Sequence, residues 1–286
     1  MHTPRTPVAL CASLLLVVPS LALAQGGTQP AAPAPAPAPA PAATTPAAPA
    51  ATPAPAPATP AAETVVNTEK RDNGLLIEDL KLGEGYQVAA GGAVVAHYRG
   101  TLKADGTEFD SSLKRGQPIA FPLNGVIKGW QEGVPGMKVG GKRRLTIPAA
   151  LAYGEKGVKD RSGKEVIPAN ADLVFEIELV NALEITDLTV GEGAEAKPSS
   201  TVVAHYKGTL KSDGTEFDSS YSRGEPATFP LNGVIRGWQW GVPGMKVGGK
   251  RKLIIPWQMA YGEQGSPPKI GPRADLVFEI ELKEVK

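Results

Sequence analysis

The sequence predicts an α+β fold made of two copies of one unit, each an antiparallel sheet curled over a short helix. Three observations support this fold class. A segment of about 100 residues occurs twice in the 286-residue chain. Within each copy, apolar residues alternate with polar ones, which is typical of half-buried strands. The only helix candidate of the first copy is short, covering residues 128–134, and Pro135-Gly136 ends it.

The two copies are related by a constant offset of 108 residues. Residues 94–156 and 202–264 share 48 identities in 63 positions, and Trp130 corresponds to Trp238. The offset falls to 103 at Phe175 and Phe278, so the first copy holds five extra residues after Tyr153. Units of this size can each bury a core of their own. We therefore predict two domains, residues 72–183 and 184–286.

Alternation and turn residues define the strands of each unit. Leu173, Phe175, Ile177 and Leu179 share one face of a predicted strand, and the glutamates between them share the other. Hairpin turns are predicted at the Asp-Gly pairs 105–106 and 213–214, and further turns at the Gly-Gly pairs 140–141 and 248–249.

The N-terminal 71 residues predict two segments outside these domains. Residues 1–24 have a basic residue, an apolar run shorter than a membrane-spanning helix and an Ala-Leu-Ala end, as in a secretory signal peptide. Residues 25–71 are expected to form a disordered linker. Its residues 25–62 hold 17 Ala and 12 Pro without a charge, a composition that favours polyproline II. This part is either a solvated spacer or a ligand for the protein's own binding sites or for a partner that recognises proline.

Composition and motifs exclude several classes of function. With 30 basic and 29 acidic residues, the chain lacks the charge of a general nucleic-acid binder. One cysteine and three histidines leave no disulfide framework, and we expect no metal and no cofactor. Residues 136–142 and 244–250 fit G-x-x-x-x-G-K, but a strand and not a helix should follow, so no phosphate loop is expected. No Ser/His/Asp arrangement offers a nucleophile.

Aromatic residues recur at matched places beside a few polar groups. Their simplest role is core packing, because each aromatic side chain buries a large apolar area. The alternative is an apolar pocket with two phenol hydroxyls and one carboxylate at its edge. The matched residues are Tyr98, Phe109, Asp110, Val126, Ile127, Trp130, Tyr153 and Phe175, and Tyr206, Phe217, Asp218, Val234, Ile235, Trp238, Tyr261 and Phe278.

Five ordered motifs in each copy resemble the FKBP-type peptidyl-prolyl cis-trans isomerases. They are His-Tyr-x-Gly-Thr-Leu, Asp-Gly-Thr-Glu-Phe-Asp-Ser-Ser, Val-Ile-x-Gly-Trp-Gln, Ala-Tyr-Gly and Leu-Val-Phe-Glu-Ile-Glu-Leu. The resemblance covers residues from about 72 to 286, twice. It implies a five-stranded antiparallel sheet wrapped around the short helix, with a proline-binding pocket between them, and isomerisation of X-Pro bonds in polypeptide substrates.

The resemblance also implies roles for residues. Trp130 and Trp238 would form the pocket floor, and the walls would be Tyr98, Phe109 and Phe175 in the first copy and Tyr206, Phe217 and Phe278 in the second. Substrate hydrogen bonds would come from the Ile127 and Ile235 N–H groups and from the hydroxyls of Tyr153 and Tyr261. The flap isoleucines align as Ile167 and Ile270, and the pocket-edge carboxylates as Asp110 and Asp218. For these carboxylates, a direct catalytic role and a structural ion pair with Arg115 or Arg223 both remain open.

The copies depart from the family pattern at two places, so their substrate preferences are expected to differ. A position that is often aromatic is Ile119 in the first copy and Ala227 in the second, and the first flap is longer and charged. We expect a secreted, monomeric isomerase of the bacterial periplasm that acts on folding exported proteins and is not inserted in the membrane. The alternative is a proline-binding chaperone or holdase with weak or no turnover in one domain.

Overall fold

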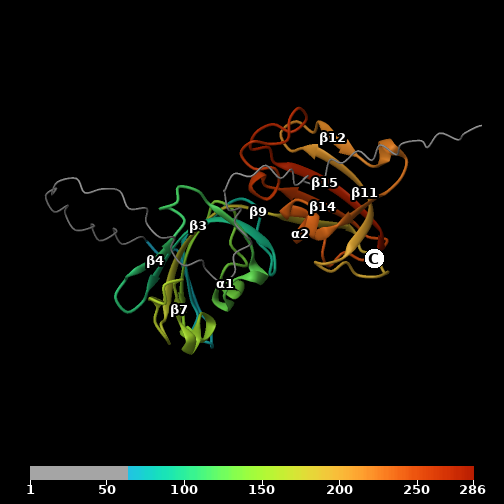
Figure 1. The fold of residues 1–286 in the computed structure, drawn as a ribbon. Helices are drawn as coiled ribbons and strands as arrows, with labels where there is room; N and C mark the ends of the chain where they lie inside the picture. Colours follow the sequence, from blue (N-terminus) through green and yellow to red (C-terminus); the bar gives the residue numbers. More distant parts are fainter. Residues whose placement is uncertain (1–63) are drawn as a thin grey trace, which may run out of the picture. The chain divides into compact units, whose positions relative to one another are not determined.

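The computed structural model describes residues 64–286. The expected signal peptide, and the expected linker up to residue 63, lie outside the described residues. The described chain divides between Glu184 and Ile185 into two compact units, here called domain 1 (residues 64–184) and domain 2 (residues 185–286) (Figure 1). No helix in these residues is long and apolar enough to span a bilayer.

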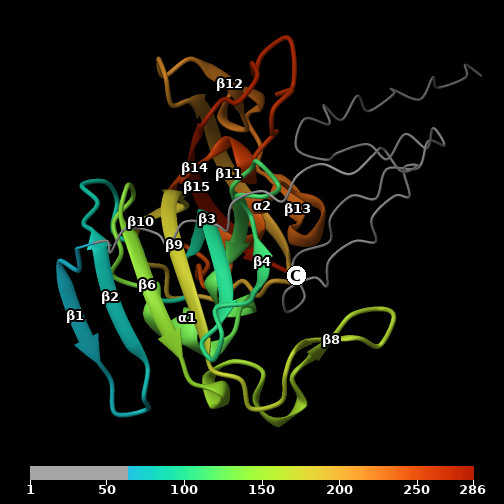
Figure 2. The same cartoon turned by 90° about the vertical axis from the view of Figure 1, so that its left-hand side faces the viewer.

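Domain 1 is a seven-stranded sheet with one short α-helix. The sheet order is β1-β2-β6-β9-β3-β4, with β5 paired to β3, and every pair is antiparallel (Figure 2). The sheet strands are β1 (Asn67–Lys70), β2 (Leu76–Lys81), β3 (Ala93–Leu102), β4 (Glu108–Ser111), β5 (Ile119–Pro122), β6 (Lys142–Ile147) and β9 (Leu173–Ala182). Helix α1 (Lys128–Gly133) follows the 3-10 turn η1 (Leu123–Gly125), and turns η2 (Ala149–Leu151) and η3 (Gly154–Lys156) follow β6.

Domain 2 repeats this plan in a six-stranded sheet. Its order is β10-β14-β15-β11-β12, with β13 paired to β11. The strands are β10 (Glu184–Thr189), β11 (Thr201–Leu210), β12 (Glu216–Ser219), β13 (Ala227–Pro230), β14 (Lys250–Ile255) and β15 (Leu276–Val285). The helix is α2 (Arg236–Gly241), and the 3-10 turns are η4 (Tyr221–Arg223), η5 (Leu231–Gly233) and η6 (Trp257–Met259).

The predicted fold class is confirmed, whereas the number of strands and the start of the first domain differ. The two sheets share five strands in one order, and each gains a short strand, β5 or β13, against the long strand β3 or β11. Domain 1 also gains β1, which lies inside the range expected to be linker. The linker prediction was wrong here because the Ala/Pro composition ends at residue 62. The Thr-Val-Val-Asn-Thr segment that follows is rich in β-branched residues, which favour strands.

Side-chain alternation places the core between the sheet and the helix. Along β9, Leu173, Phe175, Ile177 and Leu179 are buried while the residues between them are more exposed, as the alternation predicts. Helix α1 occupies residues 128–133, close to its predicted range, and packs directly on β6. This close approach requires glycine at position 129, because a Cβ there would lie 2.4 Å from Ile147 Cγ2.

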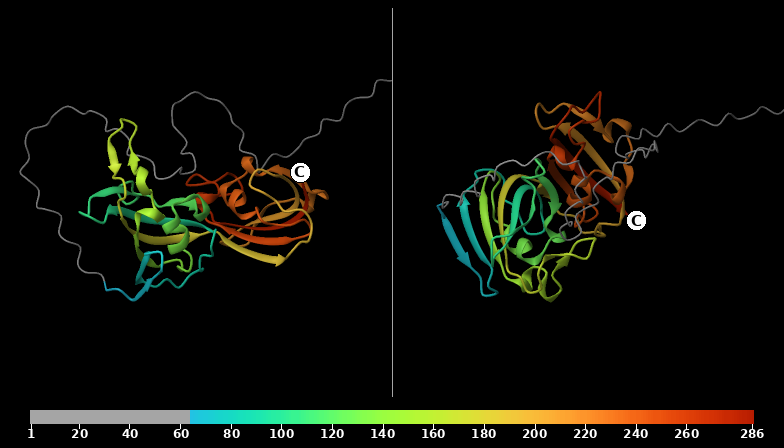
Figure 3. Two further views of the ribbon diagram at one scale, coloured as in Figure 1. Left: turned by 90° about the horizontal axis from the view of Figure 1, so that it is seen from below. Right: turned by 60° about the vertical axis from the view of Figure 1, so that its left-hand side comes forward.

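The flaps that follow Tyr153 and Tyr261 are built differently. In domain 1, where the loop is five residues longer, the flap contains a two-stranded hairpin, β7 (Val158–Lys159) and β8 (Glu165–Ile167), which projects from the sheet (Figure 3). In domain 2 the shorter loop is closed by paired backbone hydrogen bonds between Ser266 and Ile270. Lys269 Nζ also donates a 2.9 Å hydrogen bond to the carbonyl of Phe217 on β12. The aligned residue of domain 1 is the neutral Val166.

Candidate functional site: two matched aromatic clusters

The predicted site residues of domain 1 come together from six segments of the chain. Tyr98 lies on β3, Phe109 on β4, Trp130 on α1 and Phe175 on β9. Val126 and Ile127 precede α1, Tyr153 follows η2, and Ile167 ends β8. All of these apolar and aromatic residues belong to one hydrophobic cluster with the core of the domain. We call them aromatic cluster 1.

Ring contacts centre aromatic cluster 1 on Trp130. Its ring centroid lies 5.6 Å from that of Tyr98 and 5.3 Å from that of Phe175, both nearly perpendicular. Phe109 meets Phe175 edge-on at 5.5 Å. Such edge-to-face pairs add about 0.5–1.5 kcal/mol each beyond the area that they bury. The rings therefore hold one another in fixed orientations around the indole.

Aromatic cluster 2 of domain 2 has the same geometry. Trp238 lies 5.7 Å from Tyr206 and 5.4 Å from Phe278, and Phe217 meets Phe278 at 5.5 Å. Of the other matched residues, Val234 and Ile235 precede α2, Tyr261 follows η6, and Ile270 lies in the flap; all but Tyr261 are buried. We count these residues with aromatic cluster 2. The rings of the second cluster thus have the same arrangement as those of the first.

A phenol, a carboxylate and a guanidinium are linked at the edge of each cluster. The Tyr98 hydroxyl donates to Asp110 Oδ2 at 2.5 Å and accepts from Arg115 Nη2 at 2.8 Å. Arg115 also pairs with Asp110 Oδ1 at 2.5 Å. In domain 2, Tyr206 donates to Asp218, and Arg223 binds both, at 2.6 Å to the hydroxyl and 2.7 Å to Asp218 Oδ1. Both oxygens of each carboxylate therefore have a partner within the protein.

The phenols of both clusters have a raised pKa because they are buried near a carboxylate. Burial, and after it the Asp110 carboxylate, raise the pKa of Tyr153 to about 12. Burial and the Asp218 charge raise the pKa of Tyr261 to about 12 in the same way. For Tyr98 and Tyr206, burial is again the first cause of a raised pKa, followed by the hydrogen bond to the carboxylate. All four hydroxyls are thus hydrogen-bond donors at neutral pH.

Backbone groups at the helix starts are held in place by side chains. Gln131 Nε2 donates to the Val126 carbonyl at 2.6 Å, and Gln239 Nε2 donates to the Val234 carbonyl at 2.7 Å. Each fixed peptide carries the N–H of Ile127 or Ile235, which stands before the first helical residue, where an N–H has no acceptor within the helix.

The two clusters differ in how far their side chains are exposed. In cluster 2, Tyr206 is 2% exposed and Trp238 0%, whereas Tyr98 is half-buried and Trp130 is 4% exposed. Phe217, Val234 and Ile235 are buried, but their counterparts Phe109, Val126 and Ile127 are half-buried. The Trp238 Nε1 donor is buried without a hydrogen-bond partner among residues 64–286. Cluster 2 is therefore the more enclosed site.

Sequence reasoning missed two ring partners and two serines. Phe121 lies 5.2 Å from Trp130, and Phe229 lies 5.3 Å from Trp238. Their recurrence at the offset of 108 was the signal that could have found them. Ser112 and Ser220 accept from the backbone N–H of Tyr98 and Tyr206, at 2.7 and 2.8 Å, and so anchor the strand that carries each phenol.

The histidines lie apart from both clusters. His97 Nδ1 contacts Ser112 Oγ at 3.2 Å, and the ring of His205 stacks on Tyr221 at 4.7 Å. Both rings are thus partly buried and have partners within the protein. Within the part of the chain that the structure describes, no group of three or more His, Cys, Asp or Glu residues is placed to hold a metal ion.

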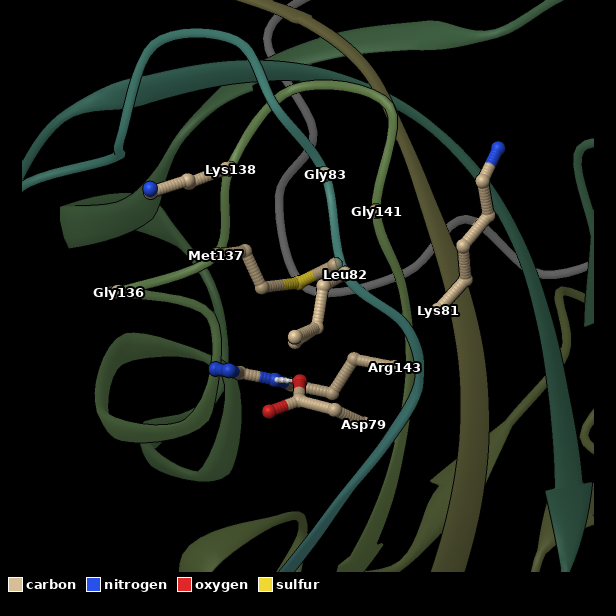
Figure 4. A pocket seen from close by; sticks show the side chains of 9 residues that line it. All are labelled: Asp79, Lys81, Leu82, Gly83, Gly136, Met137, Lys138, Gly141 and Arg143. Carbon is tan, nitrogen blue, oxygen red and sulfur yellow. Dashed lines mark hydrogen bonds and ion pairs between the residues drawn. The ribbon is translucent and has the colours of Figure 1, made fainter. Parts of the chain in front are cut away.

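A cavity of about 140 Å³ lies under the loop that fits G-x-x-x-x-G-K in domain 1 (Figure 4). Its base holds the buried ion pair between Arg143 Nε and Asp79 Oδ1, 2.7 Å long, and Arg143 Nη1 also donates to the Gly133 carbonyl. The predicted strand follows the loop as β6, so no helix N-terminus points at a phosphate. With its charge matched by Asp79, Arg143 ties β2 to the end of α1.

Comparison with known proteins points to one family. A family model described as FKBP-type peptidyl-prolyl cis-trans isomerase matches residues 85–180 and 192–283. The chain is 55% identical over 100 residues to the "Probable FK506-binding protein" of Corynebacterium glutamicum, covering 35% of this chain and 84% of that protein. It is 40% identical over 212 residues to mouse "Peptidyl-prolyl cis-trans isomerase FKBP10", covering 70% of this chain and 35% of that protein.

Among solved structures, the chain is similar to the crystal structure of FkpA from Escherichia coli. It shares 42% sequence identity over 40% of this chain and 51% of that chain, with a TM-score of 0.36. This chain therefore spans most of the corynebacterial relative, about a third of the mouse relative and half of the FkpA chain.

Proposed function

The chain belongs to the FKBP-type peptidyl-prolyl cis-trans isomerases, and on that premise we propose that both of its domains isomerise X-Pro bonds at their aromatic clusters. The observation that carries the proposal is the repeated geometry of Trp130 and Trp238, each enclosed by three aromatic rings at matched distances. Two copies of one arrangement support two sites of one activity.

The proposed chemistry needs no nucleophile. Rotation about an X-Pro bond has a barrier of ~18–20 kcal/mol because amide resonance must be broken. In the twisted amide the nitrogen lone pair is localised and the carbonyl is less polar, so an apolar enclosure favours the twisted state over the planar one. Every ~1.4 kcal/mol of such preference raises the rate tenfold. Proline stacked on the Trp130 or Trp238 indole would place the bond in that enclosure.

We assign the flanking hydrogen bonds to groups that are fixed and protonated. The N–H of Ile127 or Ile235 would hold a carbonyl of the substrate, and the hydroxyl of Tyr153 or Tyr261 would donate to a second one. Support comes from the glutamine-held peptides at the helix starts and from the raised pKa of these phenols. Phe109, Phe175 and Ile167, with their domain 2 counterparts Phe217, Phe278 and Ile270, would exclude water.

Tyr98 and Asp110, and likewise Tyr206 and Asp218, are assigned a positioning role. Each carboxylate is occupied by the phenol and by the arginine. This supports the structural ion pair over direct contact between the carboxylate and the substrate. The linked groups would keep the wall tyrosine oriented against the tryptophan.

The test is turnover of a prolyl peptide by Trp130→Leu, Trp238→Leu and the double variant. Each single variant should retain the activity of the other domain, and the double variant should lose on the order of 100-fold, the equivalent of about 2.8 kcal/mol. Trp240→Leu is the matched control, since Trp240 lies on α2 outside the ring contacts of Trp238. Undiminished turnover in the double variant would refute the assignment. Retained binding of the peptide with no turnover in the parent would identify a proline-binding chaperone.

The cellular role is part of the proposal. The signal-like residues 1–24 support export, with the bacterial periplasm as the destination and folding exported proteins as substrates. Slow X-Pro isomerisation limits the folding of many chains, so an isomerase there would accelerate their maturation. Fractionation of the producing cell tests the location. An intact protein in the cytoplasm would contradict it.

A further inference from the structure

We propose that the Ala/Pro segment of this chain, residues 25–62, is an intramolecular ligand of aromatic cluster 2 and competes there with external substrates. The inference rests on the proposed function, because it requires that the cluster bind X-Pro bonds. It assigns to the segment a role beyond that of a spacer and names the domain that it would occupy.

The segment contains the same kind of bond as the proposed substrate. Residues 25–62 contain twelve X-Pro bonds, of which eight are Ala-Pro, three Thr-Pro and one Gln-Pro. The segment has no charged residue, so none of its side chains pays the cost of burying a charge when it enters an apolar site. For a site that binds proline next to a small residue, residues 25–62 are therefore a ligand within the same chain.

Cluster 2 is more enclosed than cluster 1. Tyr206, Phe217, Ile235 and Trp238 are all buried, whereas their counterparts in cluster 1, Trp130 excepted, are half-buried. A more enclosed site accepts a slim chain more readily than a bulky one. Alanine, which precedes eight of the twelve prolines, has the smallest side chain after glycine, so the segment matches cluster 2 better than cluster 1.

Cluster 2 and the Ala/Pro segment have complementary hydrogen-bonding groups. Trp238 Nε1 at the centre of cluster 2 is a buried donor without a partner among the described residues, and leaving a buried donor unpaired is costly. Proline has no N–H, so an Ala/Pro backbone has more carbonyl acceptors than donors. An Ala/Pro segment bound in cluster 2 would therefore offer the indole a carbonyl acceptor. Trp130 Nε1 is not among the buried unpaired atoms of the described chain.

The segment is covalently tethered to domain 1 by a short stretch of chain. The segment ends at residue 62, five residues before Asn67 begins β1 of domain 1. At ~3.1 Å per residue, its 38 residues can extend about 120 Å, well beyond the size of two domains of about 100 residues with radii of gyration near 13 Å. A tethered ligand has an effective concentration in the millimolar range. Even weak affinity for one X-Pro bond would then give substantial occupancy.

The experiment uses the full chain with Trp130→Leu, so that turnover reports domain 2. Two forms are compared with this parent: one lacks residues 25–62, and one keeps their length and neutrality but has each proline of the segment replaced by serine. A tethered competitor raises KM without changing kcat. We therefore expect both forms to show KM for an external prolyl peptide lowered about two- to fivefold at constant kcat, as expected for a ligand tethered near its dissociation constant. Amide signals of Ile235 and Trp238, and the Trp238 indole signal, should shift.

The matched control is the same pair of changes in the Trp238→Leu background, where turnover reports domain 1 and KM should change little. Unchanged KM together with unchanged domain 2 spectra would overturn the inference while leaving the isomerase function intact. Shifts that grow with protein concentration would also overturn it, because the ligand would then be a second copy. Absence of turnover in the Trp130→Leu parent would count against activity of domain 2, and the indole shift would still decide whether the segment binds there.

Discussion

At the scale of single residues, the phenol of Tyr98 lies between charges of opposite sign. Its hydroxyl donates to Asp110 and accepts from Arg115, and the guanidinium carbon lies 5.6 Å from the ring centroid. Asp110 has a side chain only 8% exposed, whereas that of Arg115 is 42% exposed. Solvent therefore screens the ion pair, and most of the stabilisation comes from the hydrogen bonds of the phenol.

Asp110→Asn should lower the stability of domain 1 by about 1–2 kcal/mol, because the phenol loses a charged acceptor. Urea unfolding followed at domain 1 amide signals measures the change. Arg115→Gln keeps the Asp110 carboxylate but removes its ion pair, so it distinguishes a positioning role of Asp110 from direct contact with the substrate. If Asp110 only orients Tyr98, the two variants should reduce domain 1 turnover to a similar extent. A far larger loss in Asp110→Asn at equal stability would show that the carboxylate contacts the substrate.

Stability should fall as the pH rises from about 10 to 12. Folding raises the pKa of Tyr153 and of Tyr261 from 10.0 to about 12, so in this window the unfolded chain releases protons that the folded chain retains. The contribution is complete below pH 10 and is lost as the pH passes through 12. Urea unfolding at a series of alkaline pH values measures it. The Tyr153→Phe, Tyr261→Phe double variant should show a shallower decline, and an identical decline would contradict the assignment.

At the scale of elements, each helix packs closely against a strand at a glycine of the helix. Positions 129 and 237 have no room for a side chain: a Cβ would meet Cγ2 of Ile147 at 2.4 Å and of Ile255 at 2.3 Å. The same helices carry Trp130 and Trp238. The depth of each indole is thus fixed by how closely the helix lies on the sheet.

Gly129→Ala should therefore destabilise domain 1 by about 1–3 kcal/mol through overpacking and should reduce its turnover by moving Trp130. Gly125→Ala is the matched control, since its Cβ would lie 3.6 Å from the nearest atom. Urea unfolding and the prolyl-peptide assay in the Trp238→Leu background measure both effects. Equal stability of the two variants would show that the helix can shift at no cost.

Local patterns predicted the elements that depend on local chemistry. The alternation along Leu173–Leu179 and the Pro135-Gly136 stop placed a strand and a helix correctly. The linker prediction failed because β1 depends on pairing with another strand. β1 forms on the free edge of β2, and the proline content of the sequence does not indicate this pairing. Similarly, the different enclosure of clusters with the same aromatic residues depends on three-dimensional packing, which the 108-residue repeat does not encode.

At the scale of the whole molecule, two domains of one fold each hold a complete aromatic cluster. Every aromatic side chain that surrounds Trp130 comes from domain 1, and every one that surrounds Trp238 comes from domain 2.

We accordingly expect a monomer. Light scattering should give one mass over a wide range of protein concentration. Turnover per molecule should also stay constant on dilution, since each site is complete within one domain. A mass twice that of the chain, independent of concentration, would contradict the prediction.

The place of the last strand in each sheet has a consequence for synthesis. β9 is the final strand of domain 1, yet it lies between β6 and β3, and β15 lies in the same way between β14 and β11. While the chain grows from the ribosome, neither sheet can close until its middle strand has been made. Each domain can therefore complete its sheet only when its last strand has been made. Removal of the ten residues of β15 would divide the second sheet through its centre.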